Sequence, residues 1–293
     1  MQKIQKGRAN LPKETERYLF DPPARERVAQ AVIDGLAVAK NPLFTKEEIS
    51  SAGYRGRWLN NLKKRAENPL EQHLLCAGFL FGILLQLNRQ RDKSKKARMN
   101  EYRSSCMAHA FLIQAFWIAE TNSIQTILFL FPSDVKPLAE IWKKSCIGAL
   151  TACRCVAFTQ LAGWECYLPK PYEDWQMKTD VMAMSENPEW PFLAVQIKTG
   201  KIHQKRNFDF LLPGEPIPEQ MKKEAKYFYG GTKILQSSFS NRLWIPIIML
   251  ARFRSLNHPI RTFSEMEQDY AKQLRESVLF YQITEPRLIA CTG

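Results

Sequence analysis

Two short apolar runs, residues 177–184 and 192–198, flank the segment 185–191, which contains Ser, Asn and two Pro residues. Residues of these types favour turns, and a short apolar run bounded by such a segment is typical of a strand. The three segments therefore predict a β-hairpin. This hairpin constrains the fold more than any other feature, because a shift of one residue in its register would turn every side chain to the opposite face.

The register of this hairpin brings polar residues together. A turn centred on the middle of the segment places Met182 opposite Ala194 and Asp180 opposite Gln196. Directly opposed residues have Cβ atoms about 4.5–5.5 Å apart. Lys198 lies two residues after Gln196 and points from the same face, because strand side chains alternate. We therefore expect a carboxylate, an amide and an ammonium group on one face of the hairpin.

The composition is that of a folded protein with a polyanionic partner. Hydrophobic residues make up 45% and charged residues 24% of the 293 residues, a balance that excludes global disorder. The formal net charge is +13, with 42 Lys and Arg against 29 Asp and Glu. Such a charge favours binding to nucleic acid or to an anionic membrane surface.

Neither a membrane span nor a secretion signal is expected. The longest uninterrupted apolar stretch, Leu74–Leu85, is shorter than the about 20 residues that cross a bilayer, so it predicts a buried helix. The polar N-terminus contains no apolar signal core. The seven Cys include no CxxC pair and are interpreted as reduced core residues. These features favour a cytoplasmic protein with no membrane partner.

The pattern along the chain predicts three parts. Residues 1–23 are predicted to be a basic arm, 24–132 a helical domain and 133–293 a mixed α/β domain. In the last domain we expect a helix, three strands, a helix, a strand and a final helix, at residues 136–161, 164–168, 177–184, 192–198, 218–228, 243–250 and 264–281. Gly230-Gly231 is interpreted as a helix stop, and Pro246 indicates an edge position or a bulge.

The polar face of the hairpin suits metal-assisted hydrolysis of a phosphodiester. Carboxylate and carbonyl oxygens are hard donors that suit Mg²⁺, and Asp180, Gln196 and the backbone carbonyl of Ile197 would supply them. A bound metal ion lowers the pKa of its water and offsets charge on the phosphate. Lys198 would orient that water or stabilise the charge of the transition state.

Asp180, fifteen intervening residues and then Gln196-x-Lys198 resemble the D…(D/E/Q)xK signature of the PD-(D/E)XK nuclease superfamily. The Gln form is similar to that of RecB-type nucleases and of certain transposon endonucleases. The expected element order resembles the α-β-β-β-α-β core of the restriction-endonuclease-like fold. The resemblance covers the C-terminal half only. It implies a Mg²⁺- or Mn²⁺-dependent deoxyribonuclease, with double-stranded DNA as the substrate and Asp180, Gln196 and Lys198 as the catalytic residues.

One part of the sequence departs from the family pattern. Members usually place a metal-binding Glu on the first core helix, but the acid there is Glu140, 22 residues before Ala162. A helix rises about 1.5 Å per residue, so Glu140 would reach the site only if the helix bends or breaks near Gly148. Glu165, on the neighbouring strand, is the alternative. A third interpretation is that the site has no further carboxylate and is weak or inactive.

Basic residues near the hairpin are candidates for contacts with nucleic acid. The candidates are Lys178, Lys201, His203, Lys205 and Arg206, which would hold phosphates beside the cleavage point or would be ordinary loop charges.

Two segments of the helical domain have the same ambiguity. Residues 45–65 fit either a helix-turn-helix or any helical hairpin, and the basic run 89–103 fits either a phosphate-contacting surface or a solvated linker. A rival to the nuclease is a catalytically inactive protein of the same fold that binds DNA or serves in assembly. An RNA substrate, partner proteins and a homodimer also stay open.

Overall fold

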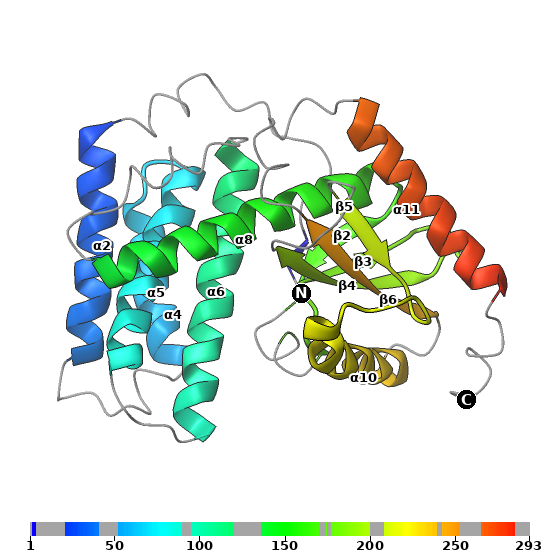
Figure 1. Cartoon of the computed structure of the whole chain (residues 1–293). Coiled ribbons are helices and arrows are strands. Elements are labelled where there is room, and N and C mark those ends of the chain that lie inside the picture. Colours follow the sequence, from blue (N-terminus) through cyan, green and yellow to red (C-terminus); the bar gives the residue numbers. More distant parts are fainter. Residues whose placement is uncertain are drawn as a thin grey trace. The chain divides into compact units, whose positions relative to one another are not determined.

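The computed structural model describes residues 2–3, 21–40, 52–89, 95–119, 136–169, 174, 177–199, 208–238, 242–251 and 265–284. These residues form a mixed α/β protein (Figure 1). The chain divides into two compact units, Arg8–Leu150 and Met1–Gly7 together with Thr151–Gly293. The division falls inside helix α8 (Lys136–Leu161). The expected boundary at residue 132 lies outside the described residues.

The first unit is helical, as expected. Its helices are α2 (Pro22–Lys40), α4 (Ala52–Arg65), α5 (Pro69–Arg89), α6 (Lys95–Ala119) and the first part of α8. Helix α5 contacts α2, α4 and α6. The window Pro69–Leu87 is long and apolar enough to cross a membrane, but 78% of it is buried inside the protein, as in a core helix. The buried helix expected at Leu74–Leu85 is therefore present.

Sequence signals account for the start of α5 and for its close packing. Asn68 caps the helix by accepting the Glu71 N–H at 2.8 Å, and Pro69 occupies the first helical position. A Cβ on Gly35 of α2 would overlap the backbone carbonyl of Phe79, and a Cβ on Gly82 of α5 would overlap that of Val32. Glycine at these two positions lets α2 and α5 pack backbone against backbone.

Two expectations for the N-terminal half are corrected. Both ends of the predicted arm, residues 1–23, belong to regular structure. Gln2–Lys3 form strand β1, which pairs with β2 (Glu165–Leu168), and helix α2 begins at Pro22. The predicted turn within residues 45–65 is absent from the described part, because α4 runs without a break through Gly56. Residues 41–51 lie outside the described part.

The second unit holds a six-stranded sheet in the order β1-β2-β3-β4-β6-β5. Strands β3 (Val181–Met184), β4 (Phe192–Thr199), β5 (Phe208–Leu211) and β6 (Trp244–Ala251) follow β2. Neighbouring strands are antiparallel except β4 and β6, which are parallel. The expected strands are thus present, with β3 beginning four residues late, and β5 was not predicted.

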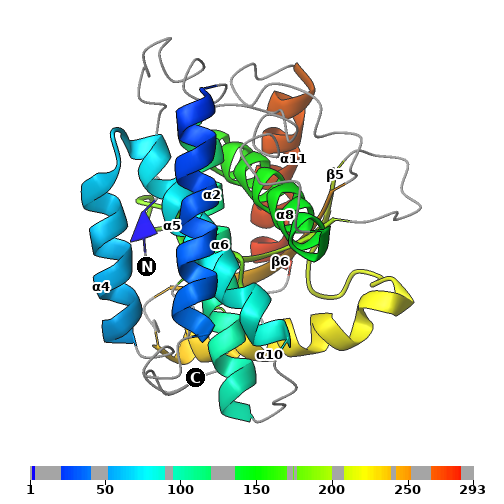
Figure 2. The same cartoon turned by 90° about the vertical axis from the view of Figure 1, so that its left-hand side faces the viewer.

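Helices lie on both faces of this sheet. On one face, Cys166 of β2 contacts the carbonyl of Val156 in α8, and Phe158 of α8 packs on Tyr270 of α11 (Glu265–Thr284). On the other face, the 3₁₀ turn η1 (Glu219–Met221) and α10 (Lys222–Ser238) cover a second core. Figures 1 and 2 both show α10 on the opposite side of the sheet from α11.

A glycine ends helix α8, whereas helix α10 continues through two glycines. Gly163, with φ of +110°, ends α8, and the N–H groups of Gly163 and Trp164 return to Gln160 and Thr159 at 3.1 Å, which is a Schellman motif. The helix stop expected at Gly230-Gly231 is wrong, because α10 continues through both residues to Ser238.

The proline in β6 is tolerated because of its position along the strand. β6 is an interior strand, whereas an edge position or a bulge was expected. Pro246 pairs with Ala194 of β4, and the ladder to β5 begins only at Ile248. At Pro246 the strand therefore has a neighbour on one side only among the described strands, which removes the need for one of its ladder hydrogen bonds.

Gly231 should be intolerant of any side chain. A Cβ there would lie 2.6 Å from Cα and 2.7 Å from the carbonyl oxygen of Met177, and both atoms belong to backbone. We expect Gly231→Ala to lower the free energy of unfolding by about 1–3 kcal/mol, measured by urea denaturation. Gly230→Ala is the matched control, because a Cβ there would meet no described atom within 4 Å, and it should stabilise the helix by about 0.5–1 kcal/mol. Equal effects would contradict this account.

Candidate functional site

The hairpin has the register that the sequence predicts. Met182 pairs with Ala194, and Val181 pairs with Val195. Asp180 lies one residue before β3 and is held to β4 by two hydrogen bonds. Its N–H donates to the Val195 carbonyl at 2.9 Å, and its Oδ2 accepts the N–H of Ile197 at 2.6 Å. The carboxylate therefore closes the end of the β3–β4 ladder.

The same contact orients the carbonyl of Ile197. In a strand, the N–H and the C=O of one residue point to the same neighbour. Because the N–H of Ile197 points to Asp180, its carbonyl also points to the side of Asp180, where the described ladder between β3 and β4 has ended at Val181. Two oxygens, one from a carboxylate and one from the backbone, are therefore directed to one place.

Gln196 contributes a third oxygen on the face that α10 covers. Gln196 follows Val195, which pairs with Val181 of β3. On β6 it pairs with Ile248, which belongs to the core under α10. Gln196 is only 5% exposed, and its Oε1 atom is buried and has no hydrogen-bond partner in the part of the chain that the structure describes. A buried polar atom without a partner costs free energy, so this oxygen is available to a ligand.

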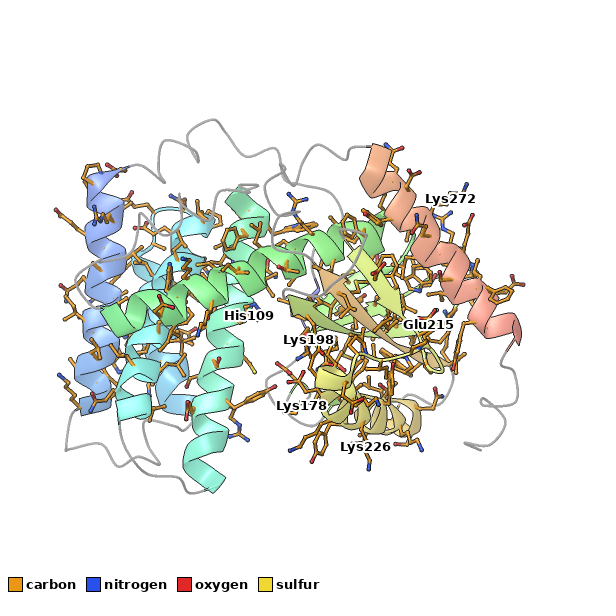
Figure 3. The ribbon with its side chains drawn as sticks, viewed as in Figure 1. His109, Lys178, Lys198, Glu215, Lys226 and Lys272 are labelled. Carbon is orange, nitrogen blue, oxygen red and sulfur yellow. The ribbon has the colours of Figure 1, made fainter. Side chains whose placement is uncertain are left out.

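Lys198 points from this face toward α10. Its Nζ lies 2.7 Å from Oε2 of Glu224, in the first turn of α10, and its side chain is 30% exposed. Figure 3 labels Lys198 among the side chains of this unit. The ion pair fixes the ammonium group at the rim of the site while solvent still reaches it. The structure therefore brings Asp180, Gln196, the Ile197 carbonyl and Lys198 to one region of the sheet.

Asp180 is held in an environment that disfavours its charge. Burial raises the pKa of this half-buried carboxyl to about 7, with a further rise from the negative charges of Asp174 and Glu224. The N–H of Ile197 and the ammonium group of Lys198 oppose this rise. A carboxylate that is destabilised in this way gains most from a cation placed beside it.

The two acids proposed to complete the site do not join Asp180. Glu165 pairs with Met184, so it lies four residues along the sheet from Asp180, or about 13 Å at 3.3 Å per residue, and its Oε2 accepts the Tyr167 hydroxyl at 2.9 Å. Glu140 required a break in the helix, but α8 is continuous through Gly148 and Glu140 belongs to the other unit. Among the described residues, no group of three His, Cys, Asp or Glu side chains could hold a metal ion.

The basic candidates are only partly placed. Lys201, His203, Lys205 and Arg206 lie outside the described residues. Lys178 is half-buried and has a φ of +53°, a left-handed conformation that is uncommon for a residue with a Cβ. It was expected on a strand beside Asp180, but its N–H instead donates to the Asp174 carbonyl at 2.7 Å.

Sequence reasoning missed three acids on this side of the molecule: Asp174, Glu224 and Asp209. Asp174 and Glu224 act on the pKa of Asp180. Asp209 pairs with Leu250, which pairs in turn with Lys198, so register places it on the same face two strands away. The signal for Asp174 was its position six residues before Asp180. Nothing in the sequence alone joins Glu224 or Asp209 to the site, because both depend on long-range packing.

No protein-family model, curated protein or solved structure matches the chain. The arguments about activity therefore depend on the residues and geometry described above.

The raised pKa of Asp180 predicts a pH-dependent stability. The folded state keeps the proton up to a pH of about 7, whereas the unfolded chain loses it above about 4. The favourable contribution of the protonated Asp180 carboxyl to the free energy of unfolding is therefore present at low pH and is lost as the pH rises from about 4 to 7. The side chain of the Asp180→Asn variant cannot ionise. The free energy of unfolding of this variant, relative to that of the wild type, should therefore rise by about 1–2 kcal/mol across this range. Urea denaturation at several pH values tests this, and parallel profiles would contradict it.

The unpartnered oxygen of Gln196 predicts opposite effects on stability with and without metal. Gln196→Met keeps an unbranched side chain and removes the unsatisfied atom, so we expect the metal-free protein to be stabilised by about 1 kcal/mol. If the oxygen binds a cation, Mg²⁺ or Mn²⁺ should raise the melting temperature of the wild type more than that of the variant. Thermal denaturation with EDTA and with each metal measures both effects. An equal metal-dependent shift in the two proteins would remove Gln196 from the ligand set.

Proposed function

We propose that this protein is a Mg²⁺- or Mn²⁺-dependent endonuclease that hydrolyses DNA phosphodiester bonds on a restriction-endonuclease-like core. The order α8, β2, β3, β4, α10, β6 supports the proposal, with β5 as an addition between β4 and η1. The observation that carries it is the junction at Asp180, where a carboxylate is bonded to the N–H of Ile197 beside the unpartnered Oε1 of Gln196.

The donor set fits a hard divalent cation. Asp180, Gln196 Oε1 and the Ile197 carbonyl would hold it, and all three donors are oxygens, as Mg²⁺ and Mn²⁺ prefer. Mg²⁺ usually keeps several waters and takes only one or two protein carboxylates, so a single Asp is compatible with binding. The ion would supply an activated water and positive charge at the phosphate.

Lys198 would act on the charge of the phosphate. Its ammonium group is held by Glu224 at 2.7 Å and is in part exposed. A cation fixed in this way stabilises charge that develops on a phosphate in the transition state. Asp180 would position the backbone at Ile197 as well as bind metal, because its Oδ2 accepts that N–H. We therefore assign metal binding and positioning to Asp180 and electrostatic stabilisation to Lys198.

The second candidate function is a catalytically inactive protein of the same fold that binds DNA or serves in assembly. One observation favours it: the described residues contain no cluster of three acids at the site. A site with one carboxylate binds a divalent cation less tightly than a site with two or three.

A cleavage assay separates the two candidates. With Mg²⁺ or Mn²⁺ the wild type should cut double-stranded DNA, and EDTA should abolish cutting. Lys198→Ala should lower the rate by about 10²–10³, the loss typical of one electrostatic stabiliser. Lys272→Ala is the control, because Lys272 is an exposed lysine of α11 that pairs with Glu276 at 3.9 Å, and it should cut at the wild-type rate.

The remaining outcomes decide between the candidates. DNA binding without cutting by the wild type would support the inactive protein. If the Lys198→Ala variant cuts DNA at the wild-type rate, the protein is a nuclease but the assigned site is rejected. An RNA strand of the same sequence, offered in parallel, tests the polymer.

A further inference from the structure

The outer face of α10 combines exposed apolar and basic side chains. Tyr227 is 61% and Ile234 43% exposed, which makes them two of the few large apolar residues on the described surface. Lys223, Lys226 and Lys233 are also exposed. At 3.6 residues per turn, Lys226 and Lys233 follow one another on one side of the face, and Tyr227 and Ile234 follow one another on the other.

A small residue separates these two stripes. Gly230 lies on the midline of the face, together with Lys223 and Ser237, which are seven residues away on either side. Gly230 is exposed, and no atom of the described residues lies within 4 Å of where its Cβ would be. A glycine inside a helix is unfavourable, and no packing against the described residues accounts for this one. It leaves the helix backbone without a covering side chain between the lysine stripe and the apolar stripe.

The charge of the face identifies the class of partner. Helix α10 contains four lysines and one glutamate, and the glutamate is already paired with Lys198. Lys222 pairs with Glu219. Lys223, Lys226 and Lys233 form no ion pair with any described residue. Unpaired lysines beside an exposed aromatic residue are typical of surfaces that bind nucleic acid.

We propose that this face, named here the α10 ridge and made of Lys223, Lys226, Tyr227, Gly230, Lys233 and Ile234, binds the DNA backbone. The three lysines would contact phosphates, and Tyr227 and Ile234 would pack on sugars and base edges. The inference rests on the proposed function, since it takes DNA as the ligand. It extends that function, because the helix that carries the ridge also carries Glu224, which holds Lys198 and lies three residues before Tyr227.

Salt dependence gives the quantitative test. Each lysine that neutralises a phosphate contributes about 0.9 to the slope of log Kd against log salt concentration. We expect the double variant Lys226→Gln, Lys233→Gln to lower that slope by about 2 and to raise Kd on the order of tenfold per lysine at 0.1 M salt. Binding is measured by fluorescence anisotropy with a labelled duplex in EDTA, so that no cutting is needed. Lys272→Gln on α11 loses one charge elsewhere and should change neither quantity.

Gly230 gives a second test that does not depend on charge. Gly230→Gln adds a long neutral side chain to the ridge and a better helix former to the helix. The variant should melt no lower than the wild type, while its Kd for the duplex should rise at least fivefold. Since the variant is folded, weaker binding would show that the duplex approaches the helix at this position. Unchanged binding by this variant and by the lysine double variant would overturn the proposal.

The outcomes separate the ridge from the nuclease. Binding that depends on the ridge, with no cutting by the wild type, supports the ridge and rejects the nuclease. If the wild type cuts DNA and the ridge variants bind and cut as the wild type does, the nuclease is supported and the ridge is rejected. No binding of the wild type to the duplex overturns the ridge. A change of oligomeric state in the variants, with DNA binding unaltered, would instead make the ridge a protein interface and would equally overturn the proposal.

Discussion

The hydrogen bond from the Ile197 N–H to the carboxylate of Asp180 is the contact on which the candidate site depends. At 2.6 Å it joins β4 to the residue that precedes β3, and it lies where the ladder between the two strands ends. Without a partner there, an N–H at the end of the ladder would need water or another acceptor. The carboxylate satisfies the backbone and, in doing so, is held beside Gln196 and the Ile197 carbonyl.

Helix α10 packs closely against the chain before β3 and contributes Glu224 to the site. Gly231 lets α10 approach the backbone of Met177, and the next residue, Lys178, donates its N–H to the Asp174 carbonyl. The same placement brings Glu224 to Lys198. Burial, together with the negative charges of Asp174 and Glu224, raises the pKa of the Asp180 carboxyl.

The sequence predicted local order well and long-range packing poorly. The register of the hairpin could be predicted because apolar alternation and a turn agreed on Met182 and Ala194. Helix α8 could be predicted because its apolar pattern ends at Gly163, which takes a positive φ. The roles of Gly231 and Asp174 could not be predicted. A glycine within a helix is interpreted as a stop unless the residue that packs against it is known, and the effect of Asp174 on Asp180 depends on how the chain folds between them. Strand β5 was missed because it is short and gains its pairing only from β6.

The unfavourable features of this unit lie in one area, and this pattern bears on function. The buried Oε1 of Gln196 has no partner, Asp180 resists ionisation, and Lys178 takes a left-handed backbone conformation. Each of these features costs free energy, and a sequence selected for stability alone would replace them. A cation beside Asp180 and Gln196 would offset the first two costs together, because it accepts charge from one residue and a lone pair from the other. A protein that kept the fold for assembly alone would still use Asp180 to satisfy the Ile197 N–H, but it would gain nothing from the unpartnered oxygen of Gln196, so the location of these costs supports the proposed cation site.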